Sequence, residues 1–444
     1  MKQILITAMH SGAGKTVVTC SLLAALKKRG IDVHAFKCGP DYIDPMFHSE
    51  VLGVPSRNLD LFLQGKDAVR SSVALHGGEF VVLEGAMGYY DGLSGTDEAS
   101  AYALADVLQF PAVLVVRPQG SMLTLAAQIK GLTAFRPKSR LAGILLNGCK
   151  ESLAASLTPV LERETGLPVL GFLPPMDEAV LESRYLGLLT AGEIEDLSGR
   201  FAMLSAQMEL TVDLDALVNL ASPCVAEKPE KKKAEQACTI AVAKDEAFCF
   251  FYADSLEALE DAGAKLAFFS PLRDSTIPEG ADGLYLCGGY PELYADRLSA
   301  NSSMRQSIRQ AVNSGLPTVA ECGGFLYLQQ TLENERKESC PMCACLPGAG
   351  FRTDRLQRFG YQWLVAEEDS LLFRRGESVP AHEFHYWDCT ENGSDLRVEK
   401  PNGKTWRCGY TGKSLYAAFP HLHLGGELPL AKRFAEACIG HAHR

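Results

Sequence analysis

The chain begins with a pattern that strongly restricts its fold: a short apolar run, a glycine-rich loop and a stretch with helical periodicity. Residues 2–8 predict a buried strand, residues 10–16 (His-Ser-Gly-Ala-Gly-Lys-Thr) the loop, and a helix follows from Val17 to near Gly30. This order is typical of a P-loop, in which backbone N–H groups cradle phosphates, the lysine neutralises the β and γ oxygens and the hydroxyl ligates Mg²⁺. Met9 stands where such loops usually begin with glycine, so the loop is a variant. The predicted nucleotide contacts are Ser11, Gly12, Gly14, Lys15 and Thr16.

Further apolar runs alternate with helical stretches through the first half of the chain. They lie at residues 33–36, 80–83, 112–116 and 141–146, and they predict an α/β fold with a doubly wound parallel sheet. Ligands bind at the carboxyl ends of the strands in such sheets.

Acidic side chains follow two of these runs. Glu84 comes directly after an apolar strand, as a Walker-B carboxylate does, and would lie beside a metal ion. Asp41 and Asp44 lie in a loop rich in Gly, Pro and Asp, and are candidates for Mg²⁺ ligation or substrate positioning, or simply turn and cap residues. Asp91 lies in a glycine-rich loop at the same end of the sheet, and Asn147 is either a base contact or a turn residue.

A charged segment interrupts the apolar pattern near the middle of the chain. Residues 222–237, which include Lys228-Pro-Glu-Lys-Lys-Lys, predict a solvated linker. A new apolar strand at 239–242 starts a second α/β unit. We therefore expect a P-loop domain over residues 1–221 and a second domain over residues 238–444.

The second domain contains a cysteine at a strand–turn–helix corner. Pro317–Ala320 predicts a buried strand, two glycines follow Cys322, and a helical pattern starts at Phe325. A thiol on such a bend is expected to be exposed, with a pKa lowered by the helix N-terminus and with N–H groups beside it that bind an oxyanion. The alternative is a buried structural cysteine.

Two other segments favour the catalytic interpretation. Gly288 and Gly289 follow a predicted strand at 283–286, and paired glycines leave backbone N–H groups free to bind an oxyanion. Residues 415–424 are a strand-like run with two histidines, His421 and His423. A cysteine, an oxyanion loop and a late histidine are the parts of a thiolate acyl-transfer site.

Two polar clusters have open interpretations. Three arginines recur every third residue and either receive carboxylates of an acidic substrate or form a solvated helix face; they are Arg352, Arg355 and Arg358. His382 and His385 resemble metal ligands, but without further ligands they indicate a packed strand near an interface.

Composition excludes several classes of protein. A net charge of −11 argues against nucleic acid or an anionic membrane as partner, and no apolar run reaches membrane-spanning length. The N-terminus does not resemble a signal peptide, and fourteen scattered cysteines then indicate reduced thiols in the cytoplasm. The cluster Cys340, Cys343 and Cys345 could ligate zinc, but no fourth ligand follows at a suitable spacing.

Ten segments, in order along nearly the whole chain, resemble the cobyrinate a,c-diamide synthase family. The most specific are Lys-Cys-Gly-Pro-Asp-Tyr-Ile-Asp-Pro-Met-Phe-His (37–48), Glu-Cys-Gly-Gly-Phe (321–325), Arg-Leu-Gln-Arg-Phe-Gly-Tyr (355–361), His-Glu-Phe-His-Tyr (382–386) and His-Leu-His (421–423). The resemblance implies an ATP-dependent synthetase domain, related to dethiobiotin synthetase and MinD-type ATPases, followed by a triad-type glutaminase domain.

The resemblance also implies roles for individual residues. Cys322 would attack the carboxamide of glutamine, and His421 would activate it, because the aromatic-x-His spacing of related amidotransferases falls on Phe419–His421. The glutamate that often follows two residues later is replaced by His423, so the third triad member is left open. The predicted oxyanion residues are Gly288, Gly289 and Gly323, the metal ligands Thr16, Asp44 and Glu84, and the substrate or acyl-phosphate contacts Asp41, Tyr42 and Asp91.

The implied substrates are ATP, L-glutamine and a cobyrinate-type tetrapyrrole, with Mg²⁺ as cofactor, in a monomer or homodimer. Hydrogenobyrinate and nickel-sirohydrochlorin a,c-diamide synthases share this mechanism and remain alternatives. An alternative of another class is a MinD-like ATPase switch with a non-catalytic second domain. The chain departs from the family pattern at Met9, Arg117, Tyr185, Cys343 and Cys345.

Overall fold

The computed structural model describes residues 1–176, 183–184, 187–188, 197–224, 226–230 and 234–443. Tyr185 and residues 225 and 231–233 of the predicted linker lie outside these ranges. The chain forms two compact units, Met1–Pro229 and Glu230–Arg444. Across the described ranges, every helix is too short or too polar to cross a membrane.

The first unit is built on a parallel sheet. Its strands run in the order β3 (Ser56–Leu59), β2 (Val33–Cys38), β4 (Phe80–Glu84), β1 (Lys2–Ala8), β5 (Ala112–Val116), β6 (Leu141–Asn147) and β7 (Val169–Leu173). A two-residue strand, β10 (Ser222–Pro223), pairs antiparallel with the start of β1. Chain order reverses at the central strand β1, and a crevice for ligands forms at such a reversal, outside the carboxyl ends of the strands.

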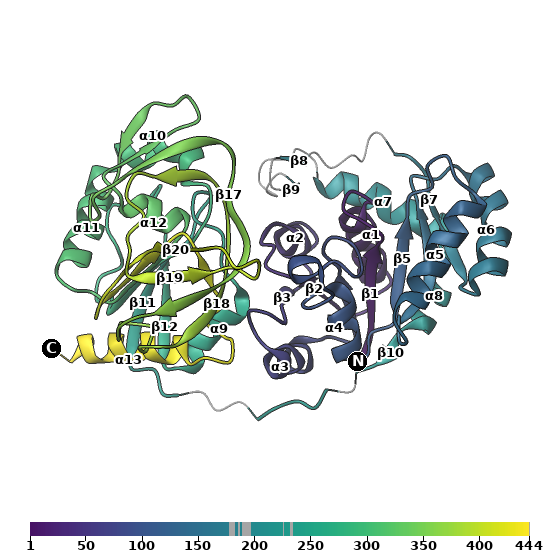
Figure 1. Ribbon diagram of the computed structural model, residues 1–444, viewed down its shortest axis with the longest axis horizontal. Helices are drawn as coiled ribbons and strands as arrows, with labels where there is room; N and C mark the ends of the chain where they lie inside the picture. The colour runs from purple at the N-terminus through teal and green to yellow at the C-terminus, as the bar shows by residue number, and fades with distance from the viewer. Residues whose placement is uncertain (177–182, 185–186, 189–196, 225, 231–233, 444) are drawn as a thin grey trace. The chain divides into compact units, whose positions relative to one another are not determined.

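Helices cover both faces of this sheet, as a doubly wound fold requires (Figure 1). Helices α1 (Lys15–Lys28), α7 (Leu197–Thr211) and α8 (Leu214–Leu220) pack on one face, where alternate strand residues such as Ile4 and Ile6 are buried. Helices α3 (Lys66–His76), α4 (Ala101–Leu108), α5 (Leu123–Phe135) and α6 (Glu151–Thr165) pack on the other face, where Leu5 is buried. The predicted parallel α/β sheet is confirmed, although α1 begins at Lys15 and not at Val17.

The second unit contains a largely parallel sheet. Its strands run in the order β12 (Ala264–Phe269), β11 (Cys238–Ala243), β13 (Gly283–Leu286), β14 (Thr318–Glu321), β22 (Leu415–Ala418) and β21 (Tyr410–Thr411), of which only β21 pairs antiparallel. Its helices are α9 (Ala253–Asp261), α10 (Ala295–Ala300), α11 (Ser302–Asn313), α12 (Gly323–Leu328) and α13 (Leu430–Ala442).

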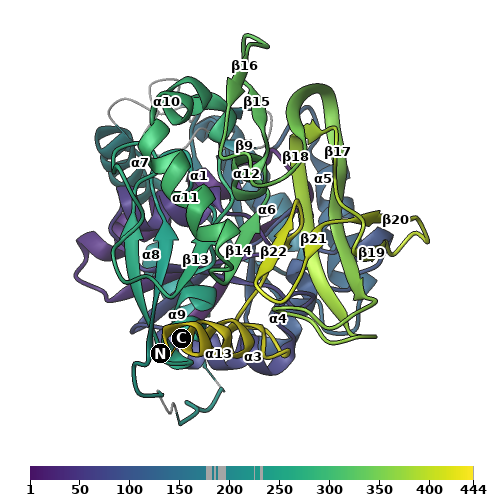
Figure 2. The same cartoon turned by 90° about the vertical axis from the view of Figure 1, so that its left-hand side faces the viewer.

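A mixed sheet shares the core of this unit (Figure 2). Its centre is the long antiparallel pair β17 (Ala349–Ala366) and β18 (Ser378–Cys389). The other strands are β15 (Thr331–Glu333), β16 (Ser339–Pro341), β19 (Leu396–Glu399), β20 (Thr405–Cys408) and β23 (His421–Leu422).

Two sequence expectations need correction here. The three arginines at 352, 355 and 358 lie on strand β17, so the helix-face interpretation is wrong. The strand-like run 415–424 is interrupted at Phe419 and Pro420, so β22 belongs to the parallel sheet while β23 pairs with β18. His421 therefore lies at the junction of the two sheets.

Candidate active sites of the two units

The P-loop connects β1 to α1 and is supported from β6. Gly12 and Gly14 have φ values of +82° and +89°, which only glycine adopts readily. The Asn147 side-chain amide donates a hydrogen bond to the Ala13 carbonyl at 2.9 Å. A Cβ atom on Gly14 would lie 2.1 Å from the nitrogen of that amide, so this position accepts only glycine. Asn147 therefore holds the loop in shape from the end of its strand.

The ammonium group of Lys15 lies within the same loop region. Its Nζ atom donates to the backbone carbonyls of Met87 at 2.6 Å and of His10 at 3.4 Å. Burial, followed by the neighbouring Lys37 ammonium, lowers the pKa of Lys15 to about 8, against the opposing effect of Glu84. Lys15 thus places a partly desolvated cation at the start of α1, where phosphate oxygens bind.

A buried polar cluster surrounds the Thr16 hydroxyl. Thr16 Oγ1 donates to Glu84 Oε1 at 2.6 Å and lies 3.3 Å from Asp44 Oδ1. Lys37 Nζ donates to Glu84 Oε1 at 3.0 Å and to Asp44 Oδ2, and His48 Nε2 lies 3.1 Å from Glu84 Oε2. The three predicted metal ligands therefore converge, with a buried lysine and histidine beside them.

The two carboxylates of this cluster titrate in opposite directions. Burial alone would raise the pKa of Glu84, but Lys37, His48 and Thr16 together hold it well below its usual range. Burial and the neighbouring Glu84 charge raise the pKa of Asp44 well above its usual value, although Lys37 opposes them. One lysine does not neutralise two buried carboxylates fully, and the cluster is therefore suited to a further cation.

Of the three residues predicted to contact substrate, Asp41 lies at the edge of this cluster. Asp41 Oδ1 accepts the Ile43 N–H at 2.8 Å, as a turn aspartate does, and its other oxygen is 3.9 Å from Lys37 Nζ. Tyr42 directly precedes the short helix α2 (Ile43–Met46). Asp91 Oδ2 accepts the Gly88 N–H at 3.0 Å and closes its own loop. Their roles toward substrate stay predictions.

Cys322 occupies the strained corner between β14 and α12. Its φ and ψ angles are 47° and −102°, a conformation that a non-glycine residue rarely adopts. A Cβ atom on Gly324 would lie 2.1 Å from the Leu286 carbonyl oxygen, so the turn passes too close to β13 for any larger residue. This strand–turn–helix bend was predicted from the paired glycines, and strain of this kind gathers at functional sites.

Gly288 and Gly289 lie between the cysteine corner and the histidine. A Cβ atom on Gly288 would lie 2.4 Å from His421 Cε1, so the imidazole packs directly on that glycine. A Cβ atom on Gly323 would lie 3.1 Å from the Gly289 nitrogen, so the two predicted oxyanion residues are neighbours. The structure thus brings together four predicted residues from three separate segments.

The protonation of this site differs from the prediction. Cys322 is only 6% exposed. Burial raises the pKa of its thiol well above the usual value, and the charges of Glu292 and Glu383 add to this effect. A hydrogen bond from the Gly323 N–H opposes the shift. The expected exposed thiol with a lowered pKa is therefore wrong, because the corner is covered. Burial and then His385 lower the pKa of His421 to about 3, so the imidazole is neutral and able to accept a proton.

His423 has different surroundings. Its ring stacks on Tyr252, with 4.9 Å between ring centroids, whereas His421 packs on Gly288. Burial lowers the pKa of His423 to about 4, so position 423 supplies no charge near neutral pH. The choice of His421 over His423 stays a prediction, and its packing against Gly288 supports that choice.

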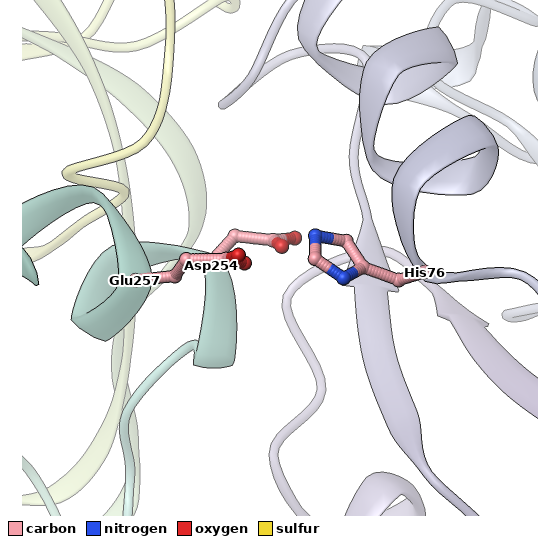
Figure 3. A group of neighbouring side chains, drawn as sticks. All are labelled: His76, Asp254 and Glu257. Atoms are coloured by element: carbon pink, nitrogen blue, oxygen red, sulfur yellow. The ribbon is translucent and has the colours of Figure 1, made fainter. Parts of the chain in front are cut away.

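Two further groups of side chains contain possible metal ligands. In the ranges that the structure describes, the cysteines at 340, 343 and 345 do not form a group of converging metal-ligand atoms. Asp254 and Glu257 lie on α9, and their carboxylates point to the same side of that helix (Figure 3). His76, also drawn there, belongs to the other unit, and we assign no site to the three.

Sequence reasoning missed several residues of these sites. Lys37 and His48 lie in the segment that carries Asp44, and a lysine at the end of an apolar run was the available signal. The partly buried Arg358 pairs with the buried Glu383, with 2.8 Å between nitrogen and oxygen, and the charge of Glu383 acts on Cys322. Nothing in the spacing of those two residues predicted that they would pair.

Comparisons with known proteins agree with the two-unit arrangement. Residues 4–186 match the family described as CobQ/CobB/MinD/ParA nucleotide binding domain, and residues 239–428 match the CobB/CobQ-like glutamine amidotransferase domain. The chain is 38% identical to the cobyrinate a,c-diamide synthase of Clostridium acetobutylicum, over 97% of this chain and 99% of that protein. Identity is 37% to the protein of that name from Clostridium tetani, over 98% and 100% of the two chains. It is 35% to the one from Thermoplasma volcanium, over 100% and 98%.

Proposed function

Because this chain belongs to the cobyrinate a,c-diamide synthase family, we propose that it amidates the a and c acetate carboxylates of cobyrinate, using ATP and glutamine, in cobalamin biosynthesis. One observation supports this most directly: a P-loop and a strained cysteine corner packed beside a histidine occur in one chain. The relatives compared above favour neither the other tetrapyrrole substrates nor a nucleotide switch.

The first unit activates the carboxylate. A carboxylate is a poor acylating agent because its oxide does not leave, and phosphorylation by ATP converts it into an acyl phosphate and ADP. The P-loop N–H groups bind the phosphates, and Lys15 stabilises the charge that develops on the transferred phosphoryl group. Asp41, Tyr42 and Asp91 lie on loops at the same end of the sheet and are our candidates for positioning the acetate side chain.

Thr16, Asp44 and Glu84 would hold Mg²⁺. A hydroxyl and two carboxylates are oxygen donors of the kind that Mg²⁺ prefers, and their convergence on Thr16 Oγ1, at 2.6 and 3.3 Å, fits such an ion. When bound, Mg²⁺ supplies positive charge to the phosphate oxygens.

The second unit supplies ammonia. His421 accepts the proton of the Cys322 thiol as the sulfur attacks the glutamine carboxamide, and the Gly289 and Gly323 N–H groups stabilise the oxyanion. The C–N bond breaks, ammonia leaves with that proton, and water hydrolyses the thioester to glutamate. Ammonia then displaces phosphate from the acyl phosphate and forms the amide. We place the protein in the cytoplasm, where its fourteen free cysteines stay reduced.

The test combines mass spectrometry with a nucleophile variant. Purified protein is incubated with ATP, Mg²⁺, glutamine and cobyrinic acid, and mono- and diamides are measured. We expect diamide from the wild type, and from Cys322→Ala only when ammonium at high pH replaces glutamine. Cys345→Ala, which changes a half-buried cysteine of the same unit, is the matched control and should behave as the wild type. Absence of both amidation and glutamine hydrolysis in the wild type would refute the proposal.

A further inference from the structure

A buried carboxylate lies next to the strand that carries His421. Glu383, on β18, is 1% exposed. In the pairing of β18 with β23, His382 is the partner of His421, so Glu383 directly follows the position opposite the base. Buried carboxylates are rare, and they need partners.

Three side chains hold Glu383 from different directions. Arg358 Nε and His385 Nε2 donate to Oε1 at 2.8 and 2.7 Å, and Gln362 Nε2 donates to Oε2 at 2.8 Å. Burial alone would raise the pKa of Glu383, but these partners lower it to about 2. Glu383 is therefore a fixed anion at neutral pH.

The same partners contact the segment that leads into His421. The ring of His385 stacks on Phe419, with centroids 3.9 Å apart and an interplanar angle of 7°. The Arg358 guanidinium carbon lies 5.3 Å from the centroid of the same phenylalanine ring. The Glu383 charge also acts on both reacting groups. Burial and Glu292 raise the pKa of Cys322 most, and Glu383 raises it further. Burial and His385 lower the pKa of His421, and the Glu383 charge opposes this lowering.

Glu321, a further buried acid at this corner, is suited to a different task. Glu321 accepts the Leu422 N–H at 2.9 Å and the Tyr285 hydroxyl at 3.0 Å, so both of its oxygens are engaged in holding backbone and core. Burial raises the pKa of Glu321 to about 7, so it is only partly charged at neutral pH. Position 423 supplies an imidazole stacked on Tyr252 and no anion.

A histidine that accepts a proton in a buried site needs an anion that stabilises the imidazolium and an anchor that fixes its ring. On these contacts we propose that Glu383 is the acidic member of the glutaminase site, a positioning residue that anchors the Phe419–His421 segment and stabilises protonated His421. This inference depends on the proposed function. The proton moves from the Cys322 sulfur to His421 and then to the departing ammonia, while Glu383 stays ionised throughout.

The test compares two neutralised carboxylates of one cluster. Glu383→Gln keeps the shape and the hydrogen-bonding oxygen but removes the charge. Asp388→Asn is the matched control, because Asp388 pairs with the terminal nitrogens of the same Arg358 guanidinium, one of them at 3.2 Å. Glutamine hydrolysis, ammonium-dependent amidation and thermal unfolding are measured for the full chain.

We expect Glu383→Gln to lower kcat for glutamine hydrolysis by about 10- to 100-fold, with KM for glutamine and ammonium-dependent amidation within about threefold of wild type. Asp388→Asn should stay within about threefold of wild type in all three. Glu383→Asp, which restores the charge, should recover most of the lost kcat. These results would support a role in charge stabilisation, since a merely structural role would affect both neutralised variants.

Two outcomes would overturn the inference. One is a Glu383→Gln protein that hydrolyses glutamine within about threefold of the wild-type kcat. The other is a Glu383→Asp protein that unfolds at the wild-type temperature but is as slow as Glu383→Gln. If Glu383→Gln fails to fold, Glu383→Asp decides alone, and a folded Glu383→Asp protein with a kcat for glutamine hydrolysis about 10-fold or more below wild type overturns the inference. Failure of the proposed function would differ, because the wild type itself would then neither hydrolyse glutamine nor form amides.

Discussion

Gly288→Ala provides a strict test of the packing between the oxyanion loop and the histidine. The new Cβ atom would lie 2.4 Å from His421 Cε1 and 3.3 Å from Phe250 Cβ. Ordinary van der Waals contact begins near 3.4 Å, so the imidazole must move by about 1 Å or the loop must shift by as much. His421 is buried and lies on a strand that pairs with β18, so moving its ring would disturb the packing around it.

A displacement of about 1 Å in a catalytic group costs about 100-fold in rate, or about 2.7 kcal/mol of transition-state stabilisation. We therefore expect Gly288→Ala to lower kcat/KM for glutamine hydrolysis by about 100-fold. Ammonium-dependent amidation should be unchanged, because it does not use the second unit's chemistry. Steady-state glutamate release and amide formation from ammonium measure the two activities separately.

Gly412→Ala is the control for this substitution. Gly412 belongs to the same unit, and a Cβ atom there would meet nothing within 4 Å. It should keep wild-type glutaminase activity. A Gly288→Ala protein within about threefold of wild type would show that His421 does not depend on this contact, and the site geometry would have to be reconsidered.

Three further predictions concern the nucleotide site and stability. A Cβ atom on residue 14 would lie 2.1 Å from Asn147 Nδ2, so Gly14→Ala should abolish ATP binding, as measured by calorimetry. Glutaminase activity should stay intact, and retained ATP binding would contradict the loop geometry. Lys37→Met leaves two buried carboxylates without their cation and should lower the free energy of unfolding in urea by about 3 to 5 kcal/mol, with partial recovery in Mg²⁺; a loss below about 1 kcal/mol would refute this. Glu377→Gln removes an ion pair with Arg433, whose nitrogens lie 2.6 Å from the carboxylate. The substitution should lower the free energy of unfolding by about 1 kcal/mol at pH 7. Hydrogen bonding to Arg433 lowers the folded-state pKa of Glu377 below 4.5. The ion pair therefore stabilises the fold above pH 4.5, and this stabilisation is lost as the pH falls. The melting temperatures of variant and wild type should then converge in acid.

The sequence predicted five strands of the first unit (β1, β2, β4, β5 and β6), since each contains a buried apolar run. It did not predict β3, whose sequence is Ser-Arg-Asn-Leu, or the partly exposed β7. Residues 112–116 form β5 as predicted, because a parallel strand covered on both faces has no polar alternation to obscure it. The segment with three arginines was harder to interpret, because β17 shifts register between Arg352 and Gln357 and again between Gln357 and Gly360. Irregular pairing of this kind breaks the two-residue period on which strand prediction depends.

The candidate catalytic groups could be identified from the sequence where a reactive side chain and a specified turn coincide. Gly-Lys-Thr and Glu-Cys-Gly-Gly-Phe each specify a turn as well as a reactive side chain. The groups that tune them could not be identified in this way, because Lys37 meets Glu84 across 47 residues and Arg358 meets Glu383 across 25. Such contacts depend on strand order and register, which no local pattern contains.

The covered position of Cys322 has a consequence for oxidative damage. Peroxide and alkylating reagents react with exposed thiolates, and sulfenic acid formation requires the same species. The Cys322 thiol is only 6% exposed and its pKa is raised, so it offers these reagents little surface and little thiolate. The protein therefore protects its nucleophile by burial, and brief exposure to peroxide should spare its ability to release ammonia.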